Sequence, residues 1–145
     1  MGRLIVFEGP DKCGKSTQLK RAEKTLRGNG FKVATFKFPN YKSPTGSKIL
    51  EMLKDPNVDM TCNRDDQMRF ANLQIEDKLA CKAELIKLIE ENDFVLLDRF
   101  VVVSIVYDFV SLTSCYNKSI VKDHTIEEDL AYLRKKYDEI SEGIN

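Results

Sequence analysis

Residues 9–16 read Gly-Pro-Asp-Lys-Cys-Gly-Lys-Ser and satisfy the G-x-x-x-x-G-K-S/T pattern of a phosphate-binding loop. An apolar run at residues 4–8 precedes the loop and is typical of a buried strand, and good helix-forming residues follow from Ser16 onward. The pattern forms a phosphate-binding site only between a strand and a helix. This context therefore favours a nucleotide-binding loop over a chance match in a glycine-bearing turn.

The residues of the loop have distinct chemical roles in such a site. Glycines let successive backbone N–H groups point at phosphate oxygens, and the start of the following helix adds a partial positive charge. Lys15 is expected to bind the β- and γ-phosphates, and the Ser16 hydroxyl is expected to hold Mg²⁺. The residues predicted to surround the phosphates are Gly9, Pro10, Asp11, Lys12, Cys13, Gly14, Lys15, Ser16 and Thr17.

The composition limits what the protein can bind. The chain has 145 residues, enough for one domain, and its 23 Lys and Arg residues balance 23 Asp and Glu residues. A net charge of zero argues against binding to polymeric nucleic acid or to an anionic membrane, and no apolar run is long enough to cross a bilayer. Four scattered cysteines and a single histidine, His124, make a zinc site unexpected. Free thiols indicate a reducing compartment, the cytoplasm or the nucleus.

Predicted strands alternate with predicted helices along the chain. Apolar or β-branched runs predict strands at residues 4–8, 32–38 and 94–97, and helical patterns cover residues 16–28 and 64–91. This order is typical of an α/β protein of the P-loop NTPase type. Such a protein has a parallel sheet flanked by helices on both faces.

The remaining segments have weaker patterns. Residues 48–53 predict a short helix, and residues 101–112, which are apolar and β-branched, predict a strand from propensity alone. Residues 125–143 predict a helix that begins with a capping box formed by Thr125 and Glu128. The apolar positions expected to face the core from the long helix at 64–91 are Met68, Leu73, Leu79, Leu85, Ile86 and Ile89.

Charged residues directly follow the third predicted strand. Right-handed crossovers bring the phosphate loop, Pro39 and Asp98 to the carboxyl edge of the sheet, where ligands bind. The Asp98-Arg99 pair is costly to bury there without a partner. Asp98 is therefore expected to hold Mg²⁺ or to act as a base toward the acceptor, and Arg99 to neutralise the transferred phosphoryl group. The alternative is a strand-terminal ion pair.

Two further features belong to the same edge. Asp11 could accept a hydrogen bond from the sugar of an acceptor. Alternatively, it is present only because aspartate is favourable in turns. A rigid turn begins at Phe38-Pro39 and continues through Tyr41 and Lys42. This turn could form a wall of an acceptor pocket.

Three short motifs resemble, in their order and spacing, those of the thymidylate kinase family. The phosphate loop alone is shared with many nucleotide kinases, whereas the three motifs together are specific. The resemblance extends over roughly residues 3–110. The matching segments are residues 7–18 (FEGPDKCGKSTQ), Phe38-Pro39 with Thr45-Gly46, and residues 97–100 (LDRF) with Ser104 and Tyr107.

The resemblance implies transfer of the γ-phosphoryl group of ATP, with Mg²⁺, to a deoxynucleoside monophosphate, usually dTMP, in a homodimer. It also implies that residues 101–107 begin a helix lining the pocket. The implied catalytic residues are Lys12, Lys15, Asp98 and Arg99, the implied Mg²⁺ ligands are Ser16 and Asp98, and the implied acceptor-binding residues are Asp11, Phe38, Pro39, Phe70, Arg99, Ser104 and Tyr107.

The chain departs from the family pattern within the acceptor site. Tyr41 stands where the family often has an arginine for the acceptor phosphate, and the neighbouring Lys42 is the expected substitute. Leu73 aligns with the arginine that reads the thymine edge. The adjacent Gln74 carries an amide with both a donor and an acceptor, and it is therefore expected to read the base.

The family's later strands and its basic lid are not found in the sequence. Residues 1–145 are therefore expected to form a single kinase domain that is incomplete at the lid and at the C-terminal strands. Within the matching part, Val103 aligns with a serine of the family, and Ser104 lies one position later. Two alternatives remain open: a deoxynucleoside kinase, whose acceptor is a nucleoside, and a non-catalytic nucleotide-binding relative.

Overall fold

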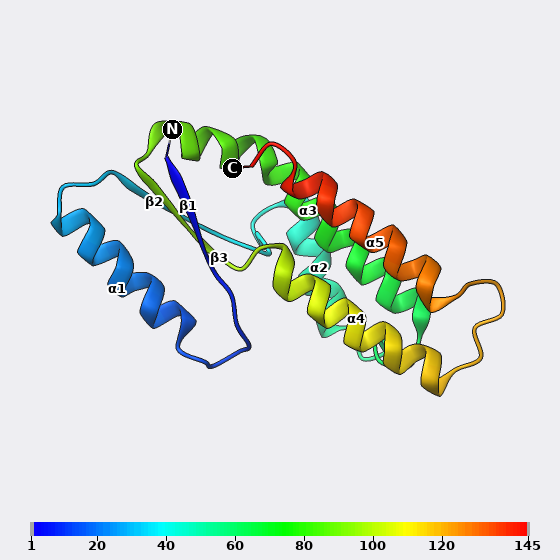
Figure 1. Cartoon of the computed structure of the whole chain (residues 1–145). Coiled ribbons are helices and arrows are strands. Elements are labelled where there is room, and N and C mark those ends of the chain that lie inside the picture. Colours follow the sequence, from blue (N-terminus) through cyan, green and yellow to red (C-terminus); the bar gives the residue numbers. More distant parts are fainter. Residues whose placement is uncertain (1, 145) are drawn as a thin grey trace.

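A three-stranded parallel sheet forms one end of the molecule, in a computed structural model that describes residues 2–144 (Figure 1). The strands lie in the order β1-β3-β2, so β3 pairs with both of the others. The elements are β1 (Arg3–Phe7), α1 (Lys15–Gly28), β2 (Val33–Lys37), α2 (Pro44–Lys54), α3 (Arg64–Glu91), β3 (Phe94–Asp98), α4 (Val101–Lys118) and α5 (Ile126–Ser141). The three predicted strands are confirmed.

Helices cover both faces of the sheet, as predicted. Leu96 of β3 packs with Leu19 of α1 and with Val33. Its neighbours Val95 and Leu97 point to the opposite face, where α3 and α5 supply the main core. Because side chains alternate along a strand, one buried strand supports both cores.

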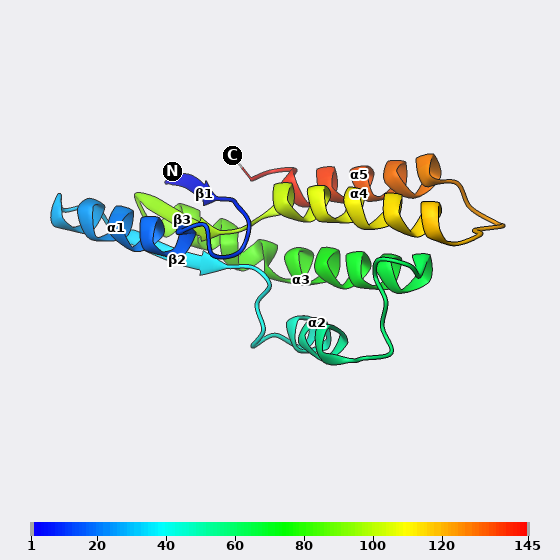
Figure 2. The ribbon, with the colours of Figure 1, turned by 90° about the horizontal axis from the view of Figure 1, so that it is seen from below.

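The four helices α2 to α5 extend beyond the sheet as a bundle. Figure 2 shows α4 and α5 on one side of α3 and α2 on the other. Polar caps fix where these helices begin. The Asn63 side chain accepts hydrogen bonds from the N–H groups of Asp65 and Asp66 at the start of α3, and the predicted capping box of Thr125 and Glu128 begins α5. None of the helices that the structure describes combines the length and apolar character needed to span a bilayer.

Two expectations about the helices are wrong. Residues 101–118 form a helix, as the family resemblance implies for residues 101–107, and not the strand that propensity alone predicts. Ser104, Asp108, Leu112 and Cys115 are its buried residues, at the three- and four-residue spacing of a helix. Two of these four are polar, so the helical period is hidden from a search for apolar residues. In addition, α2 begins at Pro44 rather than at residue 48, because Ser43 caps it.

The inward face of α3 is also more polar than expected. Leu79 is exposed and Leu73 is only partly buried, whereas Met68, Leu85 and Ile89 are in the core as predicted. The buried polar residues of α3 are Gln67, Gln74, Asp77 and Lys78. The long helix therefore carries an apolar core next to the sheet and a polar face along part of its length.

Asp77 holds the turn after β2 against α3. Its carboxylate, which is fully buried, accepts hydrogen bonds from the Asn40 N–H at 2.9 Å, the Ser43 hydroxyl at 2.7 Å and the Thr45 hydroxyl at 3.0 Å. Gly46 completes the contact, since a Cβ there would lie 1.8 Å from the Asn40 carbonyl oxygen. The turn is thereby fixed beside the carboxyl edge of the sheet.

One edge of the sheet is formed by the strand that leads into the phosphate loop. Within the described residues, β1 pairs only with β3, and its Ile5 and Val6 side chains are each 37% exposed. The strand is therefore held by hydrogen bonds along one side only.

Candidate active site

The phosphate loop has the geometry that anion binding requires. Gly14 is the N-cap of α1 with φ 86°, in the left-handed region where glycine is favoured, and Lys12 adopts φ 62°. Gly14 has no side chain with which to cap the helix. The first N–H groups of α1 therefore remain available to a phosphate.

Ion pairs join the loop, and the end of β2, to the residues at the end of β3. Lys15 Nζ of the loop lies 2.9 Å from Asp98 Oδ1, and Lys37 Nζ of β2 lies 3.8 Å from Asp98 Oδ2. Arg99, which has the strained value φ 67°, pairs with Asp11. The predicted convergence of the loop and Asp98 is therefore confirmed, and both Asp98 and Arg99 are paired with loop residues.

The end of the sheet also offers oxygen atoms that a magnesium ion could use. The contact between Lys15 and Asp98 has the distance of an ion pair but not the angles of a hydrogen bond, so Asp98 Oδ1 has no hydrogen-bond partner among the described residues. Glu8 Oε2 is likewise buried without one. No three acidic, His or Cys side chains of residues 2–144 converge as a metal site. A carboxylate, the Ser16 hydroxyl and nucleotide phosphates fit Mg²⁺, which commonly takes few protein ligands.

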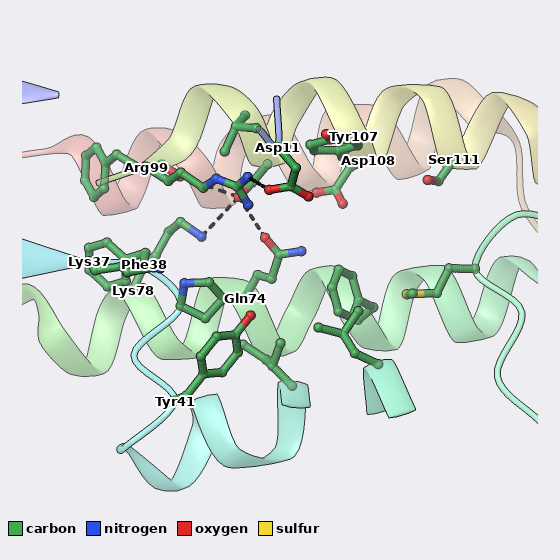
Figure 3. Close-up of a pocket in the computed structure, with 18 of the residues that line it drawn as sticks. Asp11, Lys37, Phe38, Tyr41, Gln74, Lys78, Arg99, Tyr107, Asp108 and Ser111 are labelled. Atoms are coloured by element: carbon green, nitrogen blue, oxygen red, sulfur yellow. Dashed lines mark hydrogen bonds and ion pairs between the residues drawn. The ribbon is translucent and has the colours of Figure 1, made fainter. Parts of the chain in front are cut away.

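A cavity of about 540 Å³ opens beside the loop (Figure 3). Its wall comes from the loop, the turn after β2, α2, α3 and the start of α4. The predicted site residues that line it are Asp11, Lys12, Lys15, Ser16, Phe38, Pro39, Tyr41, Phe70, Gln74, Arg99, Ser104 and Tyr107. Lys42 and Asp98 do not line the cavity. Lys42 is exposed to solvent, and Asp98 pairs with Lys15, which does line the cavity. Loop residues Gly9, Pro10, Cys13, Gly14 and Thr17 are not part of its lining.

The cavity clarifies which position of α3 faces a ligand. Gln74 lines the cavity, whereas Leu73 does not. Of these two residues, Gln74 can therefore touch a bound base. Leu73, which aligns with the base-reading arginine of the family, does not reach the cavity. On α4, both Val103 and Ser104 line the cavity.

A buried polar relay supports Gln74. Lys78 Nζ donates a hydrogen bond to Ser104 Oγ at 3.1 Å, and the Ser104 hydroxyl donates to Gln74 Oε1 at 2.8 Å (Figure 3). Burial lowers the pKa of Lys78 from 10.5 to about 8, against the attraction of nearby acidic groups. Sequence reasoning missed Lys78, although its i+4 spacing from Gln74 is a signal that the two share a helix face.

A second buried group missed by sequence reasoning is Asp108 of α4, which also lines the cavity. It accepts hydrogen bonds from Gln67 Nε2 at 2.8 Å and from the Tyr137 hydroxyl at 2.6 Å. Burial raises its pKa from 3.8 to about 6, and these donors and Lys78 oppose the shift. The i, i+4 spacing of Ser104 and Asp108 is the signal that could have identified this face.

Asp108 makes the stability of the protein depend on pH. Its pKa is raised on folding, so its contribution favours the folded state below about pH 3.8 and is lost as the pH rises through about 6. Relative to Asp108→Asn, we expect the wild-type free energy of unfolding to fall by roughly 2–3 kcal/mol across that window. Urea unfolding at several pH values measures this difference. The exposed Asp138→Asn is the control, and a difference that does not change with pH would contradict the assignment.

A phosphate loop joined through paired charges to a deep cavity beside the carboxyl edge of a parallel sheet defines a P-loop phosphotransferase. The family model for thymidylate kinase matches residues 7–141. The chain therefore belongs to the thymidylate kinase family, and the predicted enzyme class, an ATP-dependent nucleotide kinase, is confirmed.

Relatives of known sequence support this assignment. The chain is 33% identical over 150 residues to the thymidylate kinase of Caldicellulosiruptor saccharolyticus, covering 93% of this chain and 70% of that protein. It is 31% identical to the probable thymidylate kinase of Methanococcus maripaludis, covering 99% and 71%. For the thymidylate kinase of Thermoanaerobacter sp., 33% identity covers 73% of this chain and 50% of that protein. The matched part thus spans from half to about seven tenths of these relatives.

Solved structures of thymidylate kinases share the fold. The enzyme from Candida albicans superposes with a TM-score of 0.68 at 21% identity, covering 99% of this chain and 68% of that one. The enzyme from Ehrlichia chaffeensis gives 0.56 at 19% identity, covering 97% and 86%. These similarities confirm the predicted P-loop NTPase-type fold.

Proposed function

We propose that this chain transfers the γ-phosphoryl group of ATP to dTMP. One observation carries the proposal: the residues suited to phosphates and those suited to a base line a single cavity. Lys15, Ser16 and Arg99 stand at the end next to the loop, and Phe70 and Gln74 stand further in. Donor and acceptor phosphates would therefore meet at the carboxyl edge of the sheet, in the geometry that in-line transfer requires.

The charged residues would act mainly by electrostatics. Lys15 pairs with Asp98, and bound ATP would draw the ammonium onto its phosphates. Arg99 would exchange its partner Asp11 for the phosphoryl group in transfer, which frees Asp11 for the acceptor sugar. Lys12 lines the same cavity and would add positive charge. Ser16 and Asp98 would hold Mg²⁺, which would supply positive charge to offset that of the phosphates.

Turnover against a panel of acceptors tests the proposal. ADP release from ATP and Mg²⁺ is measured with dTMP, dUMP, dCMP, dAMP, dGMP and the matching nucleosides. We expect release with dTMP and none with thymidine. Turnover only with nucleosides would overturn the proposal in favour of a deoxynucleoside kinase, and ATP binding without turnover would make the chain a non-catalytic relative.

The assembly and location of the protein are also proposals. Six exposed large apolar side chains gather on α4, which supports an additional protein surface over this helix, as in a homodimer: Val102, Ile105, Val106, Tyr107, Phe109 and Val110. All four cysteines are free, which supports the cytoplasm as the compartment. That residues 1–145 form one kinase domain without its lid remains a prediction.

A further inference from the structure

The relay on α3 and α4 restricts how the Gln74 amide can point. A lysine ammonium can only donate hydrogen bonds, so Ser104 Oγ accepts from Lys78 and its own hydrogen is free for another acceptor. Gln74 Oε1 is that acceptor at 2.8 Å, and the alternative, the Phe100 carbonyl, is more distant at 3.5 Å. The positive charge behind Ser104 also favours an oxygen over an amide N–H on this side. The amide oxygen is thus directed to the relay.

The amide nitrogen of Gln74 consequently faces the cavity. Figure 3 shows the nitrogen turned away from the dashed bond to the relay and into the space between α3 and α4. The Gln74 side chain lies among the residues that line this space. The cavity therefore presents a hydrogen-bond donor, and not an acceptor, at this point of its wall.

Lys78 is buried without a carboxylate within salt-bridge distance among the described residues. Its side chain is buried, at 3% exposure, and in the described part of the chain its ammonium meets the Ser104 hydroxyl and, at 5.6 Å, the centre of the Phe38 ring. No carboxylate of residues 2–144 forms a salt bridge with it. Burying a charge in this way is costly. Orientation of a ligand-facing amide is a role that would account for the cost.

We propose that Lys78 and Ser104 are positioning residues that hold Gln74 as a donor toward a keto oxygen at position 4 of a pyrimidine base. This inference rests on the proposed function and names the base class. Thymine and uracil carry an acceptor at that position, whereas cytosine carries an amino donor that would oppose the Gln74 N–H. The Gln74 donor does not sense the 5-methyl group of thymine, so we expect dUMP and dTMP to be bound equally well at this point. The mismatch leaves a buried donor without a partner, which corresponds to about 10- to 100-fold in affinity.

Calorimetric binding of dTMP, dUMP and dCMP measures this discrimination without requiring turnover. For the wild-type chain we expect dTMP and dUMP to bind at least about 10-fold more tightly than dCMP. In Ser104→Ala the amide is free to turn, and the ratio should fall toward one. In Gln74→Glu the donor is replaced by an acceptor, and the preference should move toward dCMP. Ser114→Ala, on the same helix but away from the cavity, is the matched control.

The outcomes separate this inference from the proposed function. Equal binding of the three nucleotides by the wild type would overturn the relay while leaving the kinase in place, and so would a preference that survives in Ser104→Ala. Circular dichroism checks that each variant is folded, and Lys78→Met provides a second interruption of the relay. Loss of affinity for all three nucleotides in Lys78→Met, at an unchanged ratio, would assign Lys78 a structural role and reject the proposal. Absence of binding to any monophosphate by the wild type would overturn both proposals.

Discussion

Replacing Lys15 with alanine is expected to reduce turnover by about 1,000-fold or more while the protein stays folded. The phosphate loop is built by its backbone, with Gly14 in the left-handed conformation at the start of α1, so the loop does not need the lysine side chain to form. The ammonium instead supplies charge to the phosphates during transfer, and groups of this kind carry several kcal/mol of transition-state stabilisation. Single-turnover ADP formation with saturating dTMP measures the loss.

The control for this variant lies on the same helix. Lys24 is exposed on α1, away from the loop, and Lys24→Ala should retain wild-type turnover. Circular dichroism should show both variants folded, because in Lys15→Ala the carboxylate of Asp98 still has Lys37 as a partner. Turnover that is unchanged in Lys15→Ala would sink the assignment of the chain as a kinase.

The second large effect is expected at Asp98. Asp98→Asn keeps the shape of the side chain but removes the charge that faces Lys15 and that would face a bound Mg²⁺. We expect turnover to fall by about 100-fold or more, because an amide is a poor ligand for Mg²⁺ and cannot accept a proton from an acceptor. ATP affinity should change far less, since the backbone of the loop makes most of the phosphate contacts. Turnover and nucleotide titration together measure the split.

Asp98 also has an alternative role that the same variant can identify. The carboxylate ends the buried strand β3 and is paired with lysines on both sides. If it is only a strand-terminal ion pair, Asp98→Asn would lower the free energy of unfolding and leave turnover per folded molecule intact. Asp138→Asn, on the exposed face of α5, controls for the general effect of removing a negative charge.

The parts of the fold that depend on residues close together in the sequence could be predicted from the sequence. The loop from Gly9 to Ser16, its flanking strand and helix, and the capping box at Thr125 are local patterns, and each is where the sequence predicts it. The 64–91 helix was also predicted with its observed bounds. In contrast, the propensity of its valines alone predicted a strand for α4, and only the resemblance to the thymidylate kinase family implied the observed helix. Packing against α3 and α5 determines that this segment is a helix, and such tertiary contacts cannot be read from a local sequence pattern.

The site was predictable where it follows from strand ends and not where it depends on buried polar groups. Asp98 meets Lys15 because parallel strands end at the same edge of the sheet. Lys78 and Asp108 were not foreseen, since charged residues in a helical pattern are usually exposed. Their burial arises only when two helices place polar faces together. Gln74 was expected from the sequence to read the base because of its amide, and the orientation of α3 places Gln74, and not Leu73, in the lining of the cavity.

Within residues 2–144, β1 lies at the edge of the sheet, and we expect this position to link nucleotide binding to local unfolding. A strand paired along one side opens more readily than a central strand, and β1 carries the residues that lead directly into the phosphate loop. A ligand that binds only the closed form must lower the population in which the strand is detached. The amides of β1 would therefore exchange with solvent more slowly when ATP is bound, and the nucleotide would serve as a structural component of the sheet as well as a substrate.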